Sequence, residues 1–590
     1  MILVFGGTTE GRKAAEVLEE SGNHYYYSTK TGEQVIAVHH GQRIDGALDA
    51  EAMRTFCQKH DIRLMVDAAH PFALQLHQTI AQVSEALNIP VIRYERIYPP
   101  RDPDITWIDD YSKVPTDIHS LLATTGVQSI SKLKYLETKG IKVVYRILNR
   151  ESSIQLAHQQ GVTDDQLCFY PQTAEAEAVL MKESGLSGGF REKVAEAKEK
   201  GMRIIVLKRP ELSFKQCVDG PYGLRRAAEK LLPEFYPLHS GLTTGTCATA
   251  AAVAETLRIM KGETPDEVPV VLPNGETIQV PVGYGDDYAY CVKEAGDDPD
   301  VTSGIEIRAS ISLVGGDLKS TTHEMRISNS HQPHIEIIGG EGVGQFTLPG
   351  FDYPPGEAAI NKVPREMIRQ NLEPLTIDHS PLTITISVPQ GAEIAKRTFN
   401  PRLGIEGGIS IIGVSGIVKP FSEEAFIDSI RKCMTVAKAS GSERVVINSG
   451  GKSERFVKSL YPNLPQQAFV EYGNYIGETL KMANEFGFKY VTLGVMLGKA
   501  VKLAAGHLDT HSRKATMDKA FIQQMLHEAN CDIDISPITL ARELWEKLPA
   551  EKLKDFANTI IRHCADYCNP LLPNGSLTIL LIDDDGHIYG

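Results

Sequence analysis

The sequence has no long hydrophobic run. None of its apolar stretches approaches the roughly 20 residues that a membrane-spanning helix needs, although 42% of the 590 residues are hydrophobic. The opening segment MILVFGG lacks the basic start and the small-residue cleavage site of a secretory signal. We therefore expect a soluble protein of the cytoplasm that does not associate with membranes.

Positive charge and cysteine are also scarce. Lys and Arg number 61 against 75 Asp and Glu, a formal net charge of -14, so a nucleic-acid-binding surface is not expected. The nine cysteines are scattered, and only Cys564 and Cys568 lie close together, without the second pair of a zinc site. His507 and His511 lack the Glu of an HExxH motif, so we expect no bound metal.

What the sequence does contain is a repeated alternation of apolar strands and amphipathic helices. Residues 1–114 and again residues 115–235 follow the βαβ order of a parallel sheet with helices on both faces. Prolines mark the end of this region, and residues 236–240 are expected to form a linker. The pattern predicts two Rossmann-like lobes, the first of which would bind a dinucleotide.

The pattern changes after the linker. Residues 241–420 combine an Ala-rich helix with alternating strands, and the Asn-Gly in VPVVLPNGETIQVPV predicts a β-hairpin. Over residues 421–590 strands and helices alternate again, and the C-terminal part is mostly helical. The predicted fold class is therefore α/β, with two Rossmann-like lobes followed by an α+β domain and a further α/β domain.

A glycine-rich turn, GGTTEGR, follows the first strand directly. Glycines let the backbone approach a phosphate closely, and the helix that follows presents free N–H groups and the positive end of its dipole. An ordinary strand-to-helix turn would have a similar composition. The predicted cofactor contacts of this turn are Gly6, Gly7, Thr8, Thr9, Gly11 and Arg12.

The end of the second strand bears on the choice of nicotinamide. An NAD site places a carboxylate there for the ribose hydroxyls. This strand instead ends with Ser28, Thr29 and Lys30. Because a serine and a lysine suit a 2′-phosphate, we expect NADPH rather than NADH.

Asp67 and His70 lie at the carboxyl end of the third predicted strand. In open parallel sheets this edge faces the ligand crevice. His70 could donate a proton or bind a substrate carboxylate, and both residues are catalytic candidates. A histidine in a loop is also commonly a hydrogen-bonded structural group.

The segments FGGTTEGR, DAAHPFA, IRYER, LLATTG, YRIL and KESGLSGGFREKVAEA resemble the precorrin-6A reductase family over nearly all of residues 1–232. The resemblance implies two lobes with a cleft between them, and reduction of one macrocycle double bond by a nicotinamide hydride. The residues it places at the cleft are His70, Arg93, Thr124, Thr125, Gly126, Lys182, Ser184 and Gly185. The chain departs from the family at Tyr170-Pro171, where Gly-Pro-Phe is usual, which concerns the substrate contacts of the second lobe.

The C-terminal half has three motifs rich in glycine or threonine. TTGTC opens a helix and could form an anion pocket, although a well-capped buried helix would look the same. GIEGG indicates backbone close to a ligand or strained turns. SGGKSE lies between a strand and a helix without Walker spacing, so ATP is disfavoured. The substrate-binding candidates of the first motif are Thr243, Thr244, Gly245 and Thr246.

The segments SGLTTGTCATAAAVA, GEAAINKVPREMI, TFNPRLGIEGGISIIGVSGIV, NSGGKSER and GKAVKLAAGHLDTHSRKA are similar to cobalt-precorrin-5B C1-methyltransferases over about residues 240–520. The resemblance implies methyl transfer from S-adenosyl-L-methionine to a macrocycle carbon. Candidate cofactor contacts are Gly407, Gly408, Ser449, Gly450, Gly451 and Gly473. Arg365 and Arg402, like Arg93, are expected to bind macrocycle carboxylates.

Together the two resemblances predict a bifunctional corrin-biosynthesis enzyme whose partners are small cobalt-precorrin tetrapyrroles. The methyltransferase product would be the reductase substrate, so two consecutive steps would lie in reversed order along the chain. Neither reaction needs a catalytic triad, because the cofactors carry the chemistry. The alternative is a nucleotide-sensing or scaffold protein with one inactive half, against which the intact GGTTEGR turn argues.

Overall fold

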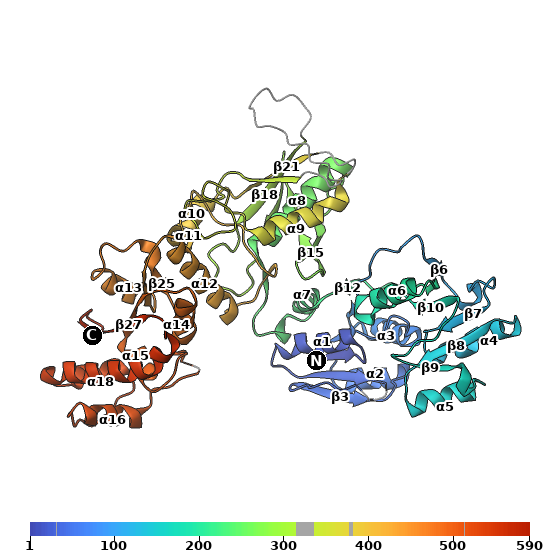
Figure 1. Cartoon of the computed structure of the whole chain (residues 1–590), viewed down its shortest axis with the longest axis horizontal. Coiled ribbons are helices and arrows are strands. Elements are labelled where there is room, and N and C mark those ends of the chain that lie inside the picture. Colours follow the sequence, from blue (N-terminus) through green and yellow to red (C-terminus); the bar gives the residue numbers. More distant parts are fainter. Residues whose placement is uncertain (31, 33, 314–334, 377–380, 513) are drawn as a thin grey trace. The chain divides into compact units, whose positions relative to one another are not determined.

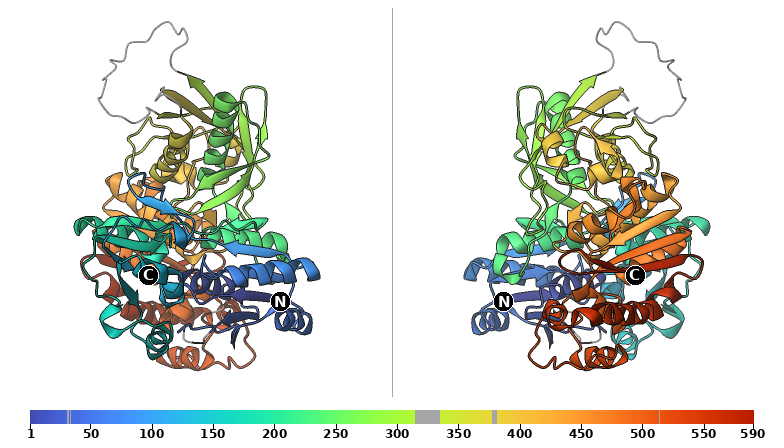
Figure 2. Two further views of the ribbon diagram at one scale, coloured as in Figure 1. Left: turned by 90° about the vertical axis from the view of Figure 1, so that its right-hand side faces the viewer. Right: turned by 90° about the vertical axis from the view of Figure 1, so that its left-hand side faces the viewer.

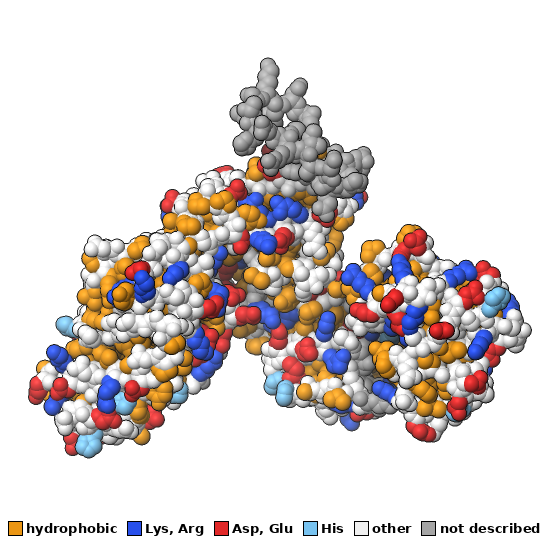
Figure 3. Space-filling view, in the orientation of Figure 1, with side chains coloured by type: hydrophobic (Ala, Val, Ile, Leu, Met, Phe, Trp, Pro, Cys, Tyr) orange, Lys and Arg blue, Asp and Glu red, His pale blue; other side chains and the backbone are white. Residues whose placement is uncertain are grey.

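The computed structural model describes residues 1–30, 32, 34–313, 335–376, 381–512 and 514–590 (Figure 1). The chain divides into two compact units. Unit 1 comprises Met1–Ser240 and Pro269–Gln279, and unit 2 comprises Gly241–Val268 and Val280–Gly590. Within the described ranges, no helix has the length and apolar character needed to cross a membrane. Acidic and basic side chains are interspersed over the surface shown in Figure 3.

The first sheet of unit 1 is entirely parallel. In sheet order its strands are β12 (Gln216–Val218), β5 (Val91–Tyr94), β4 (Leu64–Asp67), β1 (Ile2–Phe5), β2 (Tyr25–Thr29) and β3 (Gly41–Asp45). The helices α1 (Thr9–Glu19) and α7 (Pro221–Leu231) pack on one face, and α2 (Ala50–Lys59) and α3 (Leu74–Leu87) on the other. Because both faces are covered, strands such as ILVF and LMVD are hydrophobic at nearly every position.

The second sheet of unit 1 is also parallel. In sheet order its strands are β6 (Thr106–Ile108), β11 (Arg203–Leu207), β10 (Ala178–Lys182), β7 (Ser120–Ala123), β8 (Lys142–Ile147) and β9 (Leu167–Phe169). The helices α4 (Ile130–Thr138) and α5 (Glu151–Gln159) pack on one face, and α6 (Phe190–Glu199) on the other. The predicted α/β class with parallel sheets is confirmed.

The chain crosses between the two lobes twice. Residues 95–105 lead from β5 to β6, and residues 208–215 lead back from β11 to β12, which pairs with β5. The second sheet therefore includes β6, which lies before residue 115. Residues 216–235 return to the first lobe, although the sequence pattern placed these residues in the second lobe. Strands of three residues, such as β6 and β12, carry too little periodicity to be recognised in a sequence.

The strands β14 (Glu267–Val271) and β15 (Thr277–Pro281) pair across the predicted Asn-Gly turn. The tip of this hairpin belongs to unit 1. The buried Glu276 accepts a hydrogen bond from the N–H of Gly223 (3.0 Å), and Asp219 accepts one from the N–H of Thr277 (2.7 Å). These buried polar contacts explain why a segment from the α+β region packs with the reductase-like lobes.

Unit 2 begins with a buried helix, α8 (Thr244–Lys261), which packs on α9 (Lys362–Leu372) and on a five-stranded sheet. In sheet order the strands are β16 (Gly283–Tyr284), β17 (Ala289–Val292), β18 (Glu306–Leu313), β21 (Leu382–Ser387) and β19 (Ile335–Gly339). All of these pairings are antiparallel except β19 with β21. This part of the chain has the mixed α+β character that its alternating strands predict.

The C-terminal sheet of unit 2 is again mainly parallel. In sheet order its strands are β25 (Phe469–Glu471), β24 (Arg444–Asn448), β26 (Tyr490–Met496), β27 (Ser576–Ile582) and the antiparallel β28 (Ile588–Tyr589). One face is covered by α12 (Glu423–Ala439), α14 (Ile476–Glu485), α15 (Leu497–Ala504) and α18 (Ala550–Cys568), and the other by α13 (Gly451–Lys458). The long dark-red helix beside these strands in Figure 2 is α18.

The strand order of this sheet reverses between β24 and β26. From β24 the chain moves to β25 on one side, and from β25 it crosses to β26 on the other side. In open α/β sheets ligands bind at such a reversal, outside the carboxyl ends of the strands.

Candidate functional site

Gly6 and Gly7 form the turn after β1, where the absence of a side chain on Gly6 leaves space for the ring of Tyr27. A Cβ atom on Gly6 would lie only 2.1 Å from Oη of Tyr27, and Gly7 has a φ of +86°, which favours glycine. The Tyr27 hydroxyl donates to Gln34 (2.7 Å), which also accepts from the N–H of Gly7 (3.0 Å). The two glycines add no side chain to the turn, but the Gln34 side chain contacts its backbone at the Gly7 N–H and at the Thr8 carbonyl (2.8 Å).

Thr8 fixes the start of α1. Its Oγ1 accepts from the N–H of Gly11 (2.9 Å) and donates to the carbonyl of Ala68 (2.6 Å). In the described part of the chain, the N–H groups of Thr9 and Glu10 have no acceptor. This helix N-terminus can therefore bind an anionic group.

The end of β2 lies beside an ion pair on β3 that the sequence did not reveal, between Arg43 and Asp45 (3.2 Å). Ser28 is buried, Lys30 is exposed, and Arg12 is exposed in the first turn of α1. Arg43 lies on the neighbouring β3, and its Nε is buried without a hydrogen-bond acceptor among the described residues. Arg43 was not predicted as a site residue, because the sequence pattern does not indicate β3 as a strand beside β2.

Asp67 is completely buried at the end of β4. Its Oδ1 accepts from Nη1 of Arg93 (2.9 Å), and its Oδ2 lies 2.6 Å from Nδ1 of His77. Arg93 is only 1% exposed, and its other donors reach the Ala69 carbonyl (3.0 Å) and Glu95 (3.3 Å). The parallel register places Arg93 beside Asp67 and uses its donors internally, and its binding of a substrate carboxylate stays a prediction.

His70 follows this buried network and is half-buried. Its Nδ1 accepts from the N–H of Phe72 (3.3 Å), and its carbonyl lies 3.0 Å from Nε2 of His77. Burial, followed by the charges of Arg96 and Lys182, lowers the pKa of His70 to about 3. At neutral pH its imidazole is uncharged, which suits a hydrogen-bonding role better than proton donation, one of the two roles predicted for His70 beside the binding of a substrate carboxylate.

Arg96 and Glu10 join the two lobes of unit 1. The buried Arg96 donates from Nε to Glu10 (2.9 Å) and from Nη1 to the carbonyl of Ser184 (2.7 Å). Glu10 also accepts from the hydroxyl of Ser187. Gly185 has a φ of +69°, and a Cβ there would lie 2.8 Å from Cβ of Arg96. The structure thus brings Ser184 and Gly185 close to the first turn of α1.

Lys182 ends β10 and reaches the first lobe, where its Nζ lies 5.1 Å from the centroid of the Phe72 ring. The turn after the neighbouring β7 contains Thr124, Thr125 and Gly126, and Gly126 has a φ of +88°. The two threonine hydroxyls are used in local hydrogen bonds. Lys182 is therefore the most available cation among the cleft residues that the sequence predicted.

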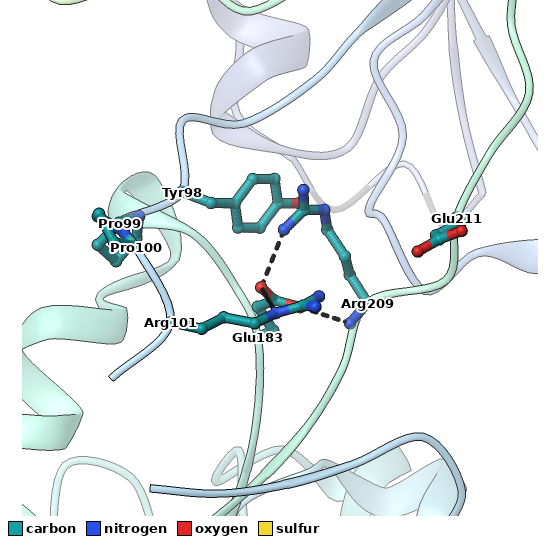
Figure 4. Close-up of a pocket in the computed structure, with 7 residues that line it drawn as sticks. All are labelled: Tyr98, Pro99, Pro100, Arg101, Glu183, Arg209 and Glu211. Atoms are coloured by element: carbon teal, nitrogen blue, oxygen red, sulfur yellow. Dashed lines mark hydrogen bonds and ion pairs between the residues drawn. The ribbon is translucent and has the colours of Figure 1, made fainter. Parts of the chain in front are cut away.

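A cavity of about 380 Å³ lies where the two crossovers meet (Figure 4). The buried Glu183 binds Arg101 (3.0 Å) and Arg209 (2.9 Å), and Arg209 lies 3.7 Å from the centroid of the Tyr98 ring. Glu183 pairs with both arginines and Glu211 also lines the cavity, so its two positive charges are matched by two negative ones. A carboxylate is therefore better suited to the ammonium of Lys182 than to this cavity. The contacts around the cavity connect the crossover segments instead.

In unit 2, three loops converge where the C-terminal sheet reverses. Ser449 and Gly450 follow β24, Glu471 ends β25, and Lys499 begins α15 after β26. A Cβ on Gly450 would lie 3.3 Å from Oε1 of Glu471, and Nζ of Lys499 donates to the carbonyl of Gly473. Within the described chain the Glu471 carboxylate has no hydrogen bond, and burial raises its pKa. The glycines were among the residues predicted from the sequence, whereas Glu471 and Lys499 were not.

The glycine-dense stretch is joined to this region by Arg402, whose Nη1 donates to Glu454 in α13 (2.6 Å). Gly407 faces open space, so its side could accept a ligand. Gly408 is needed for packing, because a Cβ there would lie 2.1 Å from the carbonyl of Gly342. Arg402 thus holds two predicted motifs together and is not a free carboxylate partner.

The TTGTC motif has a structural role in the described chain. Thr244 and Thr246 are buried, and their hydroxyls bind the backbone of residues 410–416. Arg365 is only 6% exposed and donates to backbone carbonyls and to Glu357. The donors of these residues hold α8, α9 and the following loops together, and their binding of substrate stays a prediction.

Comparison with known proteins assigns the N-terminal and C-terminal parts of the chain to different families. Residues 233–420 match the family described as CbiD, and residues 509–590 match the family described as CbiD, C-terminal domain. A cobalt-precorrin-5B C(1)-methyltransferase of Prosthecochloris aestuarii is 39% identical over 359 residues, which span 58% of this chain and 94% of the relative. The chain belongs to the cobalt-precorrin-5B C(1)-methyltransferase family. A relative of the same name from Brucella canis is 42% identical over 54% of this chain and 84% of its own length.

The N-terminal part of the chain matches a second family. Residues 1–222 match the family described as Precorrin-6x reductase CbiJ/CobK. A crystal structure of the cobalamin biosynthesis protein cbiD from Archaeoglobus fulgidus is 28% identical with a TM-score of 0.26, over 47% of this chain and 83% of that one. Both resemblances inferred from the sequence, to the methyltransferase and to the reductase, are confirmed by the sequence matches.

Proposed function

We propose that the chain is a bifunctional enzyme of corrin biosynthesis. Unit 2 methylates cobalt-precorrin-5B at C1 with S-adenosyl-L-methionine, and unit 1 reduces the resulting cobalt-precorrin-6A with a nicotinamide. One observation carries this proposal. The chain matches a methyltransferase relative over 94% of that relative's length, and its residues 1–222 match the reductase family. We also propose a cytoplasmic location, where the nine free cysteines stay reduced.

The turn after β1 fits a dinucleotide. Gly6 and Gly7 add no side chains to this turn, and the free N–H groups of Thr9 and Glu10 suit a pyrophosphate. Ser28, Lys30 and the buried, unpaired Nε of Arg43 support the 2′-phosphate of NADPH over NADH, while Nη2 of Arg43 binds Asp45 (3.2 Å). When bound, the nicotinamide supplies a hydride. The residues of this chain hold it, orient the macrocycle and exclude water.

Two lysines join Arg93 as candidate partners for the acetate and propionate groups of the macrocycle. Lys182 has no counter-ion among the described residues, and Lys193 donates to the carbonyl of Gly188 (2.8 Å). Both are half-buried, and burial lowers the pKa of each. A carboxylate entering the cleft would relieve this unbalanced positive charge.

The reversal point of the C-terminal sheet fits S-adenosyl-L-methionine. Glu471 ends the strand next to the turn of Ser449 and Gly450, where a carboxylate can accept from ribose hydroxyls. The N–H groups at the start of α13 suit the carboxylate of the donor. The sulfonium supplies an activated methyl group, so the chain's own task is to align donor and acceptor in a dry site.

One reaction tests the whole proposal. The intact chain is incubated with cobalt-precorrin-5B, S-adenosyl-L-methionine and either NADPH or NADH. We expect the mass of one added methyl group, then that of two added hydrogens, with faster loss of absorbance for NADPH. Methylation without reduction would restrict the assignment to unit 2. Nicotinamide or donor binding with no turnover would instead support the alternative of a sensing or scaffold protein.

The role of Glu471 can be tested separately. Glu471→Gln should weaken S-adenosyl-L-methionine binding by about ten- to a hundredfold, because hydrogen bonds to a charged acceptor contribute about 1.5–3 kcal/mol. Isothermal titration calorimetry on the whole chain measures this affinity. The control is Glu478→Gln, which removes an exposed carboxylate paired with Lys481 (2.8 Å). Equal affinities in the two variants would remove Glu471 from the donor site.

A further inference from the structure

The ammonium of Lys182 has an unusual position in unit 1. It stands at the carboxyl end of β10 in the second lobe, and its Nζ lies 5.1 Å from the ring of Phe72 in the first lobe. The Phe72 ring lies 5.9 Å from the ring of His70, at the carboxyl end of β4. Lys182 therefore reaches from one lobe to the edge of the other sheet where a ligand is expected.

The acidic groups around this cleft are already paired. Glu10 binds Arg96, Asp67 binds Arg93, and Glu183 binds Arg101 and Arg209. Among the described residues, no carboxylate forms an ion pair with Lys182.

The remaining charged neighbours of Lys182 are cations. Lys132 on α4 lowers the pKa of Lys182, while Arg93, Arg96 and Lys193 act with Lys182 on the neutral His70. Burial is the largest cause of the shift of Lys182, and its pKa falls to about 8. Lys182 is thus mostly protonated at pH 7 and is a stronger acid than an exposed lysine.

Reduction of a double bond by a nicotinamide requires a proton as well as a hydride. The hydride forms a C–H bond at one carbon, the π electrons move to the neighbouring carbon, and that carbon must take up a proton. His70 is uncharged at neutral pH and has no proton to spare as an acid.

We propose that Lys182 is the proton donor of the reductase reaction, acting from the second lobe on a macrocycle carbon opposite the nicotinamide. This inference rests on the proposed reductase function. The N–H bond of the ammonium breaks as the C–H bond forms, and the neutral amine then recovers a proton from water. The alternative role of Lys182 is to bind a substrate carboxylate. An arginine at this position could bind a carboxylate but could not donate a proton.

The test uses Lys182→Arg in the whole chain, with cobalt-precorrin-6A and NADPH in single turnovers from pH 6 to pH 10. Arginine keeps the positive charge but does not release a proton in this range. We expect its reduction rate to fall by about 10²-fold or more, with the affinity for cobalt-precorrin-6A nearly unchanged. Methylation of cobalt-precorrin-5B by the same molecules shows that the variant chain is folded.

The pH profile gives a second, independent measurement. The wild-type rate should be full below the pKa of Lys182 and fall about tenfold per pH unit above pH 8. Lys132→Met should retain activity and move this alkaline limb to higher pH, because removing a nearby positive charge makes the ammonium a weaker acid.

Three results would overturn the inference in different ways. If Lys182→Arg reduces at the wild-type rate with the wild-type pH profile, Lys182 only binds substrate and the reductase function stands. Lys182 is likewise excluded as the proton donor if the alkaline limb is absent from the wild type or does not move in Lys132→Met. If the wild-type chain does not reduce cobalt-precorrin-6A at all, the reductase function fails and the role of Lys182 fails with it.

Discussion

A Gly6→Ala variant should lose about 10²-fold or more in NADPH affinity and reductase rate while it continues to methylate cobalt-precorrin-5B. The new Cβ would lie 2.1 Å from Oη of Tyr27, a fully buried side chain that Gln34 holds in place. The turn after β1 must therefore shift by about an ångström, and misplacement of that size in a binding site can cost about 10²-fold. Fluorescence titration with NADPH and single-turnover reduction measure the two effects.

The matched control is Gly22→Ala, at the other end of α1. Gly22 has a φ of +69° and open space around its Cα, so alanine adds backbone strain of about 1 kcal/mol without a steric clash. This variant should be slightly less stable and bind NADPH normally. If Gly6→Ala also bound NADPH like the wild type, the dinucleotide would have to lie elsewhere in unit 1.

The sequence allows the sheets to be predicted better than the boundaries between lobes. Strands such as ILVF and LMVD are continuous hydrophobic runs between amphipathic helices, which is typical of buried parallel strands. The short strands β6 and β12 have no such signal, and they are the ones that carry the chain from one lobe to the other. Local pattern therefore fixes which elements form, whereas the exchange between sheets depends on tertiary pairing.

The candidate sites show the same limit. GGTTEGR could be recognised because its glycines act locally, in one turn. Glu471 could also have been found, since it ends a strand about 20 residues after the SGG turn, as in dinucleotide-binding units. The contact of Arg96 with Glu10 joins residues 86 positions apart and leaves no local trace. Likewise, Arg93 was expected in the cleft because nothing in IRYER reveals its partner Asp67 on the neighbouring strand.

These buried contacts also separate the residues that react from those that position them. Asp67, Arg93 and His77 are shielded from solvent and support the backbone around His70. Lys182 remains half-buried and without a counter-ion in the described chain. The buried charges of Asp67 and Arg93 thus neutralise each other, whereas the ammonium of Lys182 stays available to donate a proton.

Arg93→Met is expected to lower the free energy of unfolding of unit 1 by about 3–5 kcal/mol, because it leaves the fully buried Asp67 carboxylate without its charged partner. The double variant Asp67→Asn with Arg93→Met removes both charges and should be less destabilised than Arg93→Met alone, since the Asn side chain can still accept from His77. Differential scanning calorimetry of the whole chain measures both, with methylation activity reporting that unit 2 is intact.

The control for this pair is Arg203→Met, which removes an arginine that is 41% exposed and lies 2.9 Å from Asp117 on the surface of the same unit. An exposed ion pair contributes only about 0–1 kcal/mol, so this variant should unfold close to the wild-type temperature. If Arg93→Met were no more destabilising than Arg203→Met, water would have to compensate the Asp67 charge. The buried network could then not be what holds the loop of His70 in place.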